Sequence, residues 1–190
     1  MDDETLYLTL NGPIEDAQTA QLIQLIQNAI VQEGLTHIYL AINTPGGSVN
    51  AGIMLYHYLQ ALSVKITTHN VGQVDSIGNM VFLSGEDRFT SPATSFLLHG
   101  VSLRVDGNIQ INKGQLKELQ SQIGQDEARI EAITSVRTNL SKTQLSRFFR
   151  TGRSLSPTEA KKYGIVTEIR ELNIPSGAKT AVVNTFPIAN

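Results

Sequence analysis

The sequence predicts an α/β fold with a mostly parallel sheet, and two observations carry this prediction. Apolar runs typical of buried strands alternate three times with helical patterns in the first half of the chain. Two of the expected strands also end in glycine-containing turns that lead directly into helices. The carboxyl ends of parallel strands are where the active sites of such sheets usually gather. We therefore expect both turns to lie at one functional edge of the sheet.

The elements of the first hundred residues can be placed from their apolar periodicity and from their capping and turn residues. Ser48, for example, stands at the N-cap position before an apolar pattern of helical spacing. The expected strands are 6–10, 37–42, 65–71, 88–90 and 95–99, and the expected helices are 16–33, 48–62 and 77–83.

A projecting β-hairpin is expected next. Val101–Val105 and Asn108–Ile111 alternate on both sides of Asp106-Gly107, which is a strong hairpin signal. A hairpin beside the site would offer its edge to an extended peptide. The substrate-binding residues that we expect are therefore Asn108, Ile109, Gln110 and Ile111.

The second half of the chain contains one long helical stretch, 113–139, whose apolar stripe is narrow. Such a stripe is typical of a helix that projects and needs a partner surface, so we predict an oligomerisation element. An ordinary surface helix on the chain's own core is the alternative. Short helices are expected at 141–149 and 157–163, followed by a last strand, 165–167, and by a loosely attached tail from Asn173. We expect one domain, with a head (1–100 and 140–170), a hairpin and long helix (101–139) and a tail (173–190).

Composition excludes several classes of protein. With 190 residues, a formal net charge of −2 and 17% charged residues, the chain lacks the basic stripe of a nucleic-acid binder. It has no cysteine, which excludes disulfides, thiol catalysis and thiolate metal sites. Its acidic N-terminus lacks the order of a signal peptide, and no apolar run approaches a membrane span. We expect a cytoplasmic protein without cofactor, metal, nucleic acid or membrane as a partner.

The two turns and one histidine form a candidate site for acyl transfer. Gly46-Gly47 ends a strand where exposed backbone N–H groups can bind a negative oxygen. Ser76 begins a helix after the next strand, so its hydroxyl is expected to be an exposed nucleophile. His99 ends a strand on the same side of the sheet and is the expected general base. The other histidines, His37, His57 and His69, are expected to be structural.

In their order and separation these residues resemble the proteolytic subunit of the Clp protease (ClpP) family, from Leu6 to about Ile169. The matching segments are 8–14, 42–47 with 51–52, 72–78, 97–99, 155–156 and 159–164. The resemblance implies a ClpP/crotonase-like fold, Ser76 as nucleophile and His99 as base, with the N–H groups of Gly47 and Ile77 as the oxyanion hole. It also implies that the long helix is the handle that joins two rings of a homo-oligomer, which encloses peptide or unfolded-protein substrates.

The chain departs from this pattern at the third member of the triad. The family's catalytic aspartate is expected at Gly152, and no carboxylate flanks it. The loss of this acid costs about 10⁴-fold in rate in serine proteases. Either Ser76 and His99 act as a weaker dyad, with His99 oriented by a backbone carbonyl, a water or the Thr151 hydroxyl, or the subunit is inactive. Asp75 is not expected to serve, because neighbours in an extended segment point in opposite directions.

A second departure concerns partners. The first expected strand starts within a few residues of Met1, which implies a shortened N-terminus without the family's axial loops. An ATP-dependent unfoldase partner therefore stays open but is not the expectation. The alternative functions are a non-catalytic ClpP-like subunit, a crotonase-like acyl-CoA enzyme, and a Ser–Lys peptidase that uses Lys113 or Lys117.

Overall fold

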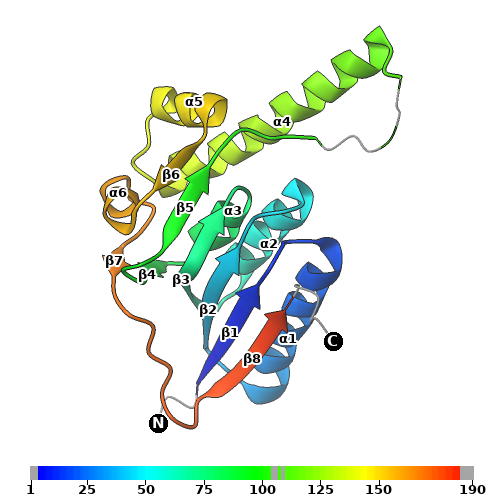
Figure 1. Cartoon of the computed structure of the whole chain (residues 1–190). Helices are drawn as coiled ribbons and strands as arrows, with labels where there is room; N and C mark the ends of the chain where they lie inside the picture. Colours follow the sequence, from blue (N-terminus) through cyan, green and yellow to red (C-terminus); the bar gives the residue numbers. More distant parts are fainter. Residues whose placement is uncertain (1–3, 104–106, 108–109, 185–190) are drawn as a thin grey trace.

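A computed structural model of the chain describes residues 4–103, 107 and 110–184 (Figure 1). The predicted α/β class is confirmed, and the elements follow one another in the expected order. In the first half these are β1 (Thr5–Asn11), α1 (Asp16–Glu33), β2 (His37–Thr44), α2 (Val49–Ala61), β3 (Lys65–Asp75), α3 (Gly78–Leu83), β4 (Asp87–Thr90) and β5 (Ser95–Leu98). In the second half these are α4 (Lys113–Arg137), α5 (Lys142–Thr151), β6 (Arg153–Leu155), α6 (Pro157–Lys162), β7 (Glu168–Ile169) and β8 (Lys179–Asn184).

The strands form one sheet with the order β6-β5-β3-β2-β1-β8. Among the described residues every strand pair is parallel except β5–β6. Helices α1, α2 and α3 cover one face of the sheet (Figure 1), and the buried core lies between them and the strands. The mostly parallel layout places the carboxyl ends of β2, β3 and β5 next to one another.

β3 is longer than expected, since it runs to Asp75 rather than to Val71. Two short strands share its edge: β4 pairs with Thr67–Asn70, and β5 pairs with Gln73–Asp75. The second pairing extends β3 up to the residue before Ser76. It thereby brings the end of β5, with His99 directly after it, beside the turn that carries Ser76.

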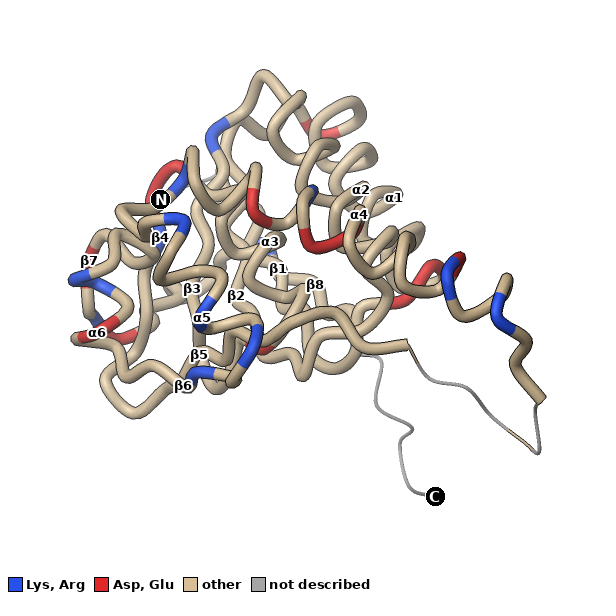
Figure 2. The backbone as a smooth tube through the Cα atoms, turned by 90° about the horizontal axis from the view of Figure 1, so that it is seen from above, with Lys and Arg blue, Asp and Glu red and all other residues tan. Residues whose placement is uncertain are grey.

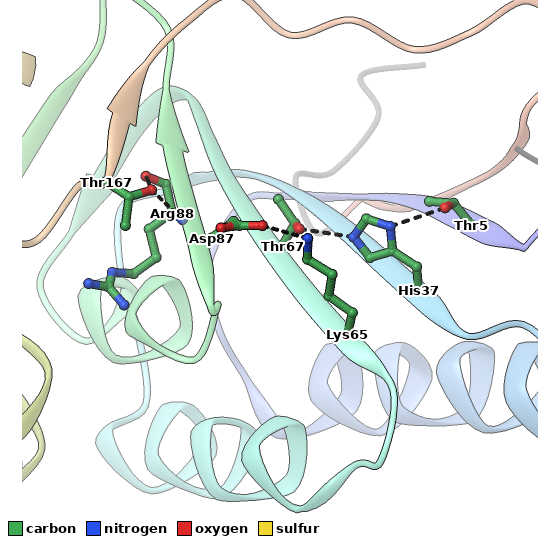
Figure 3. A network of polar contacts seen from close by, with 7 residues as sticks. All are labelled: Thr5, His37, Lys65, Thr67, Asp87, Arg88 and Thr167. Carbon is green, nitrogen blue, oxygen red and sulfur yellow. Dashed lines mark hydrogen bonds and ion pairs between the residues drawn. The ribbon is translucent and has the colours of Figure 1, made fainter.

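The opposite end of the sheet is tied by polar side chains (Figure 3). His37 contacts the hydroxyl of Thr5 through Nδ1 at 3.1 Å and that of Thr67 through Nε2 at 2.9 Å. Lys65 pairs with Asp87 at 2.7 Å on the neighbouring strands. This network joins β1 to β4 near their amino ends, so His37 has the structural role that we expected.

The hairpin expected at 101–111 is not seen in the described part of that segment. Val101–Leu103, Gly107, Gln110 and Ile111 belong to no strand, and Asn108 and Ile109 lie outside the described residues. The start of the segment bonds to helices instead: Gly100 N–H donates to Phe149 O (2.9 Å) and Val101 N–H to a carboxylate oxygen of Glu127 (3.2 Å). These contacts hold the start of the segment against α4 and α5, and residues 104–106, 108 and 109 of the expected hairpin lie outside the described residues.

Two expectations for the end of the chain were wrong. Ile165 and Val166 are buried but form no strand, because their N–H groups donate to Ala160 O at the end of α6. The last short strand is instead Glu168–Ile169. The tail was expected to be loosely attached, yet Lys179–Asn184 forms β8, which pairs in parallel with β1 over Leu6–Asn11.

Helix α4 projects from the rest of the molecule, and Figures 1 and 2 show this from two directions. Its capping box at Asn112 and Gln115 closes the far end. In the first half of the helix, residues 113–125, every side chain is exposed or half-exposed, and burial begins at Asp126. Lys/Arg and Asp/Glu positions are interspersed over the elements in Figure 2, in keeping with the small net charge.

Candidate active site

The Pro-Gly-Gly turn after β2 is held against the start of the chain. Ile14 N–H donates to Gly46 O and Ser48 N–H donates to Ile14 O, both at 2.8 Å. Gly47 lies between these two bonds with φ 150°, and a Cβ there would lie 2.2 Å from Ile14 O. Only glycine fits this turn. Within the described residues the Gly47 N–H has no acceptor, so it can donate to a ligand.

Ser76 occupies a strained turn between β3 and α3. Its φ of 56° is the one positive value among the described non-glycine residues. The turn is fixed because Ser76 N–H donates to Leu97 O of β5 at 2.8 Å. The next residue, Ile77, offers a second backbone N–H without an acceptor in the described part of the chain. Strain of this kind costs about 1–3 kcal/mol and is typical of catalytic nucleophiles on strand-to-helix turns.

Asn79 connects this turn to β5 through hydrogen bonds, a role that was not predicted from the sequence. Its Nδ2 donates to Leu97 O (2.9 Å), Ser76 O (3.0 Å) and Val74 O (3.3 Å). Its side chain is buried, and Oδ1 has no partner among the described residues. In the sequence, Asn79 is the one amide within the apolar run 77–83. A buried amide needs several hydrogen-bond partners, so its position in this run was the one signal of its role.

One pocket brings together Gly47, Ser76, Ile77 and His99. Its cavity volume is about 60 Å³, within a wider hollow of about 520 Å³ that includes open solvent. The rest of its wall is largely apolar and comes from α2, α3, β5, α4 and α5: Val49, Met80, Leu98, Ile130 and Phe149. The pocket can thus hold an apolar side chain next to a hydroxyl, an imidazole and two free N–H groups.

The imidazole of His99 is oriented by its own backbone. Its Nδ1 lies 2.7 Å from Gly100 O, so the Nδ1–H tautomer donates to this carbonyl and leaves Nε2 without a proton. Among the described residues no hydrogen bond joins Ser76 and His99. Both line the same pocket, and such bonds are often long in the absence of substrate.

Gly152, where the sequence analysis expects the family's aspartate, follows the register to a place opposite His99. β5 and β6 pair antiparallel with Leu98 opposite Arg153, so the register continued by one residue places Gly152 opposite His99. The Thr151 hydroxyl is exposed and donates to Arg147 O at 3.0 Å. It is therefore directed at its own helix and does not line the pocket.

Asp75 lies on the other side of His99. Asp75 pairs with Leu97, so their side chains share one face of the sheet. His99 comes two residues after Leu97, and the alternation of a strand places it on the same face. Burial raises the pKa of the Asp75 carboxyl, while His99 and the Leu97 backbone lower it. The extended segment ends at the turn that carries Ser76, so the side chains of Asp75 and Ser76 need not point in opposite directions. Asp75 is therefore not excluded as the acid beside His99.

Comparison with known proteins identifies the family of the chain. The sequence model of the family described as Clp protease matches residues 3–173. The chain belongs to the Clp protease family. It is 28% identical over 169 residues to the "ATP-dependent Clp protease proteolytic subunit" of Lactococcus lactis subsp. cremoris (strain SK11) and, equally, to that of Lactococcus lactis subsp. lactis (strain IL1403). In both comparisons the match covers 87% of this chain and 83% of the relative.

Other predicted residues of this Clp protease family member lie away from the pocket. Gln110 and Ile111 are exposed and precede α4. Lys113 and Lys117, considered for a Ser–Lys dyad, are exposed at the projecting start of α4 and do not line the pocket.

Neither a metal site nor a membrane span is found in the parts of the chain that the structure describes. No group of three or more His, Asp or Glu residues there could hold a metal ion. No helix among those residues is long and apolar enough to cross a bilayer.

Proposed function

We propose that this Clp protease family member is a serine endopeptidase that cleaves peptides or unfolded protein inside an oligomeric chamber. The observation that carries the proposal is the pocket in which Ser76, His99 and the free N–H groups of Gly47 and Ile77 meet. A hydroxyl, a base and two amide donors are the parts that acyl transfer requires.

The reaction would proceed through an acyl-enzyme. Ser76 Oγ attacks the scissile carbonyl carbon while His99 Nε2 accepts the hydroxyl proton. The oxyanion accepts hydrogen bonds from Gly47 and Ile77 N–H. The C–N bond breaks as His99 returns the proton to the leaving amine. A water molecule then attacks the ester carbonyl carbon as His99 Nε2 accepts its proton, and the ester C–O bond breaks as His99 returns that proton to Ser76 Oγ.

The Gly100 carbonyl supports this role for His99. By accepting from Nδ1–H it favours the tautomer in which Nε2 is the base. A neutral carbonyl stabilises the imidazolium less than a carboxylate does, so we expect slower turnover than with a complete triad.

The chamber would be built from copies of this chain, with α4 as the contact. In the described part of the chain, the first half of α4 is exposed and projects from the other elements. The substrate would lie extended along the segment between His99 and α4, where we retain Asn108–Ile111 as the predicted binding residues. The relatives' names indicate ATP dependence, so an ATP-driven unfoldase is a candidate partner in the cytoplasm.

Labelling with a fluorophosphonate tests the catalytic part. The wild-type chain should gain one adduct on Ser76, and peptide hydrolysis should stop in parallel. Ser76→Ala should abolish labelling and His99→Ala should slow it at least about 100-fold. Ser135→Ala, an exposed serine on α4, is the matched control and should behave as the wild type.

A non-catalytic subunit is the second candidate, and two observations favour it. His99 makes no hydrogen bond to Ser76 among the described residues, and Gly152 brings no acid to His99. This candidate predicts a defined oligomer that neither labels nor hydrolyses peptides. An active Clp protease labelled in the same tube would show that the probe is competent.

A further inference from the structure

We propose that Asp75 is the positioning residue for His99, so that the negative charge missing from β6 comes from β3. This inference rests on the proposed serine peptidase and deepens it. The acid would then be the sequence neighbour of the nucleophile, Ser76. It would act on His99 from the β3 side, whereas the family's aspartate is expected at Gly152, on the β6 side.

The sheet register is the first argument. His99 extends β5, which lies between β3 and β6. On the β6 side the register leads to Gly152, which has no side chain, and the neighbouring Thr151 hydroxyl is bonded to Arg147 O. On the β3 side Asp75 pairs with Leu97 and therefore shares the face of His99. Of these two neighbours only β3 offers a carboxylate.

The surroundings of the carboxyl group are the second argument. Asp75 is half-buried; burial raises the pKa of its carboxyl group, and the charge of His99 lowers it. Among the described residues the two make no hydrogen bond or ion pair, so Asp75 would act through space. In a partly buried site such an interaction is screened less than in water.

Other groups near His99 do not fill this role. Gly100 O accepts from Nδ1 but carries no charge. The Glu127 carboxylate on α4 accepts from Val101 N–H, which holds the segment after His99 rather than the imidazole. Among the described residues of the strands next to β5, Asp75 is thus the carboxylate that the register places on the face of His99.

The effect would be on the chemical step. His99 becomes an imidazolium only after it has taken the Ser76 proton, so a nearby anion stabilises the transition state more than the substrate complex. Asp75→Asn should lower kcat about 10- to 100-fold and leave KM within about twofold, less than the roughly 10⁴-fold loss when a hydrogen-bonded triad acid is replaced. The fluorophosphonate labelling rate should fall by the same factor.

A rescue separates positioning from a structural role. Gly152→Asp, made in the Asp75→Asn background, supplies a carboxylate from the residue before β6, and it should restore the rate at least about tenfold. No atom of the described residues lies within 4 Å of a Cβ at Gly152, although its φ of 69° makes Asp less favourable than Gly. Asp87→Asn, which removes a half-exposed carboxylate far from the pocket, is the matched control.

The possible results separate the inference about Asp75 from the peptidase proposal. Loss in Asp75→Asn with rescue by Gly152→Asp supports the inference. Full kcat in Asp75→Asn, or loss without rescue in a protein of unchanged melting temperature and oligomer size, overturns it and leaves the peptidase proposal intact. Failure of the wild type to label at Ser76 overturns the peptidase proposal, and the inference with it.

Discussion

A Cβ atom on Gly47 would lie 2.2 Å from the carbonyl oxygen of Ile14. The contact exists because Ile14 bridges Gly46 O and Ser48 N–H, which presses the turn after β2 against the chain that follows β1. The same two bonds leave the N–H of Gly47 directed away from Ile14 and free for a ligand. The close approach of the backbones and the proposed oxyanion hole therefore have one cause.

Gly47→Ala should destabilise the close approach of the two backbones and weaken the proposed oxyanion hole. The backbone must move to relieve the contact and φ of 150° is unfavourable for alanine, so we expect a loss of about 2–4 kcal/mol in the free energy of unfolding. Displacement of one oxyanion donor should lower kcat about 100-fold or more. Urea unfolding and peptide hydrolysis measure these effects. Gly124→Ala, in the open first half of α4, is the control and should raise stability by up to about 1 kcal/mol.

Asn79→Ala should loosen the turn that carries Ser76. Removal of the Nδ2 donor leaves three backbone carbonyls without this partner, and we expect a loss of about 1–3 kcal/mol. Asn79→Asp should cost more, because it replaces the donor with an oxygen facing carbonyl oxygens. Asn28→Ala on the exposed side of α1 should stay within about 0.5 kcal/mol. Equal stability of Asn79→Ala and wild type would contradict the role of the amide.

The alternation of strands and helices could be predicted because it depends on local periodicity and capping. Gly34, Ser48, Ser141 and Ser156 all end or begin helices as expected. The tail was missed because Lys179–Asn184 is short and follows Pro and Gly. Its strand character depends on pairing with β1, which is far away in sequence.

The meeting of Ser76 and His99 at one pocket could be predicted because both follow parallel strands of one sheet. The roles of Asn79 and Asp75 could not. Asn79 depends on carbonyls of β5, and Asp75 depends on a register between β3 and β5 that no local pattern encodes.

His69 gives the folded state a specific pH dependence. Burial lowers its pKa to about 4, and its ring contacts the Tyr39 hydroxyl (2.7 Å) and the Ser91 hydroxyl (3.1 Å). The pKa is lower in the folded state than in the unfolded state, so His69 stabilises the fold fully above pH 6.5. As the pH falls from 6.5 to 4, the unfolded chain binds the proton first and stability is lost.

The loss should be about 3 kcal/mol over this range. His69→Gln should lose this part of the pH dependence, although it should be less stable at pH 7 because it cannot keep both contacts. Urea unfolding at pH 7, 5.5 and 4 gives the comparison. Carboxylates titrate in the same range in all variants, so the difference between variants is decisive. Asn28→Ala, at an exposed position on α1 that does not titrate, should keep the wild-type slope.

Substitutions at two adjacent valines test whether β8 packs as a strand with one buried face. Val183 is fully buried, whereas Val182 is 60% exposed on the other face of the strand. Val183→Asp buries a carboxylate in the core and should cost at least about 3 kcal/mol, whereas Val182→Asp should cost less than about 1 kcal/mol. Equal stability of the two variants in urea unfolding would mean that β8 does not pack as a strand in solution.

The proposed chamber predicts that α4 controls assembly. Leu116 is 50% exposed on the projecting half of the helix, and Leu119 and Ile123 are half-exposed beside it. Leu116→Asp places a charge in the contact between copies, so sedimentation velocity should show smaller particles. The fold of the subunit should persist, because Leu116 is remote from the core. Val31→Asp is the matched control: Val31 is an apolar residue on α1 that is 81% exposed, and its replacement should leave the particle size unchanged. If Leu116→Asp keeps the wild-type particle and Val31→Asp dissociates it, the contact lies on α1 rather than on α4.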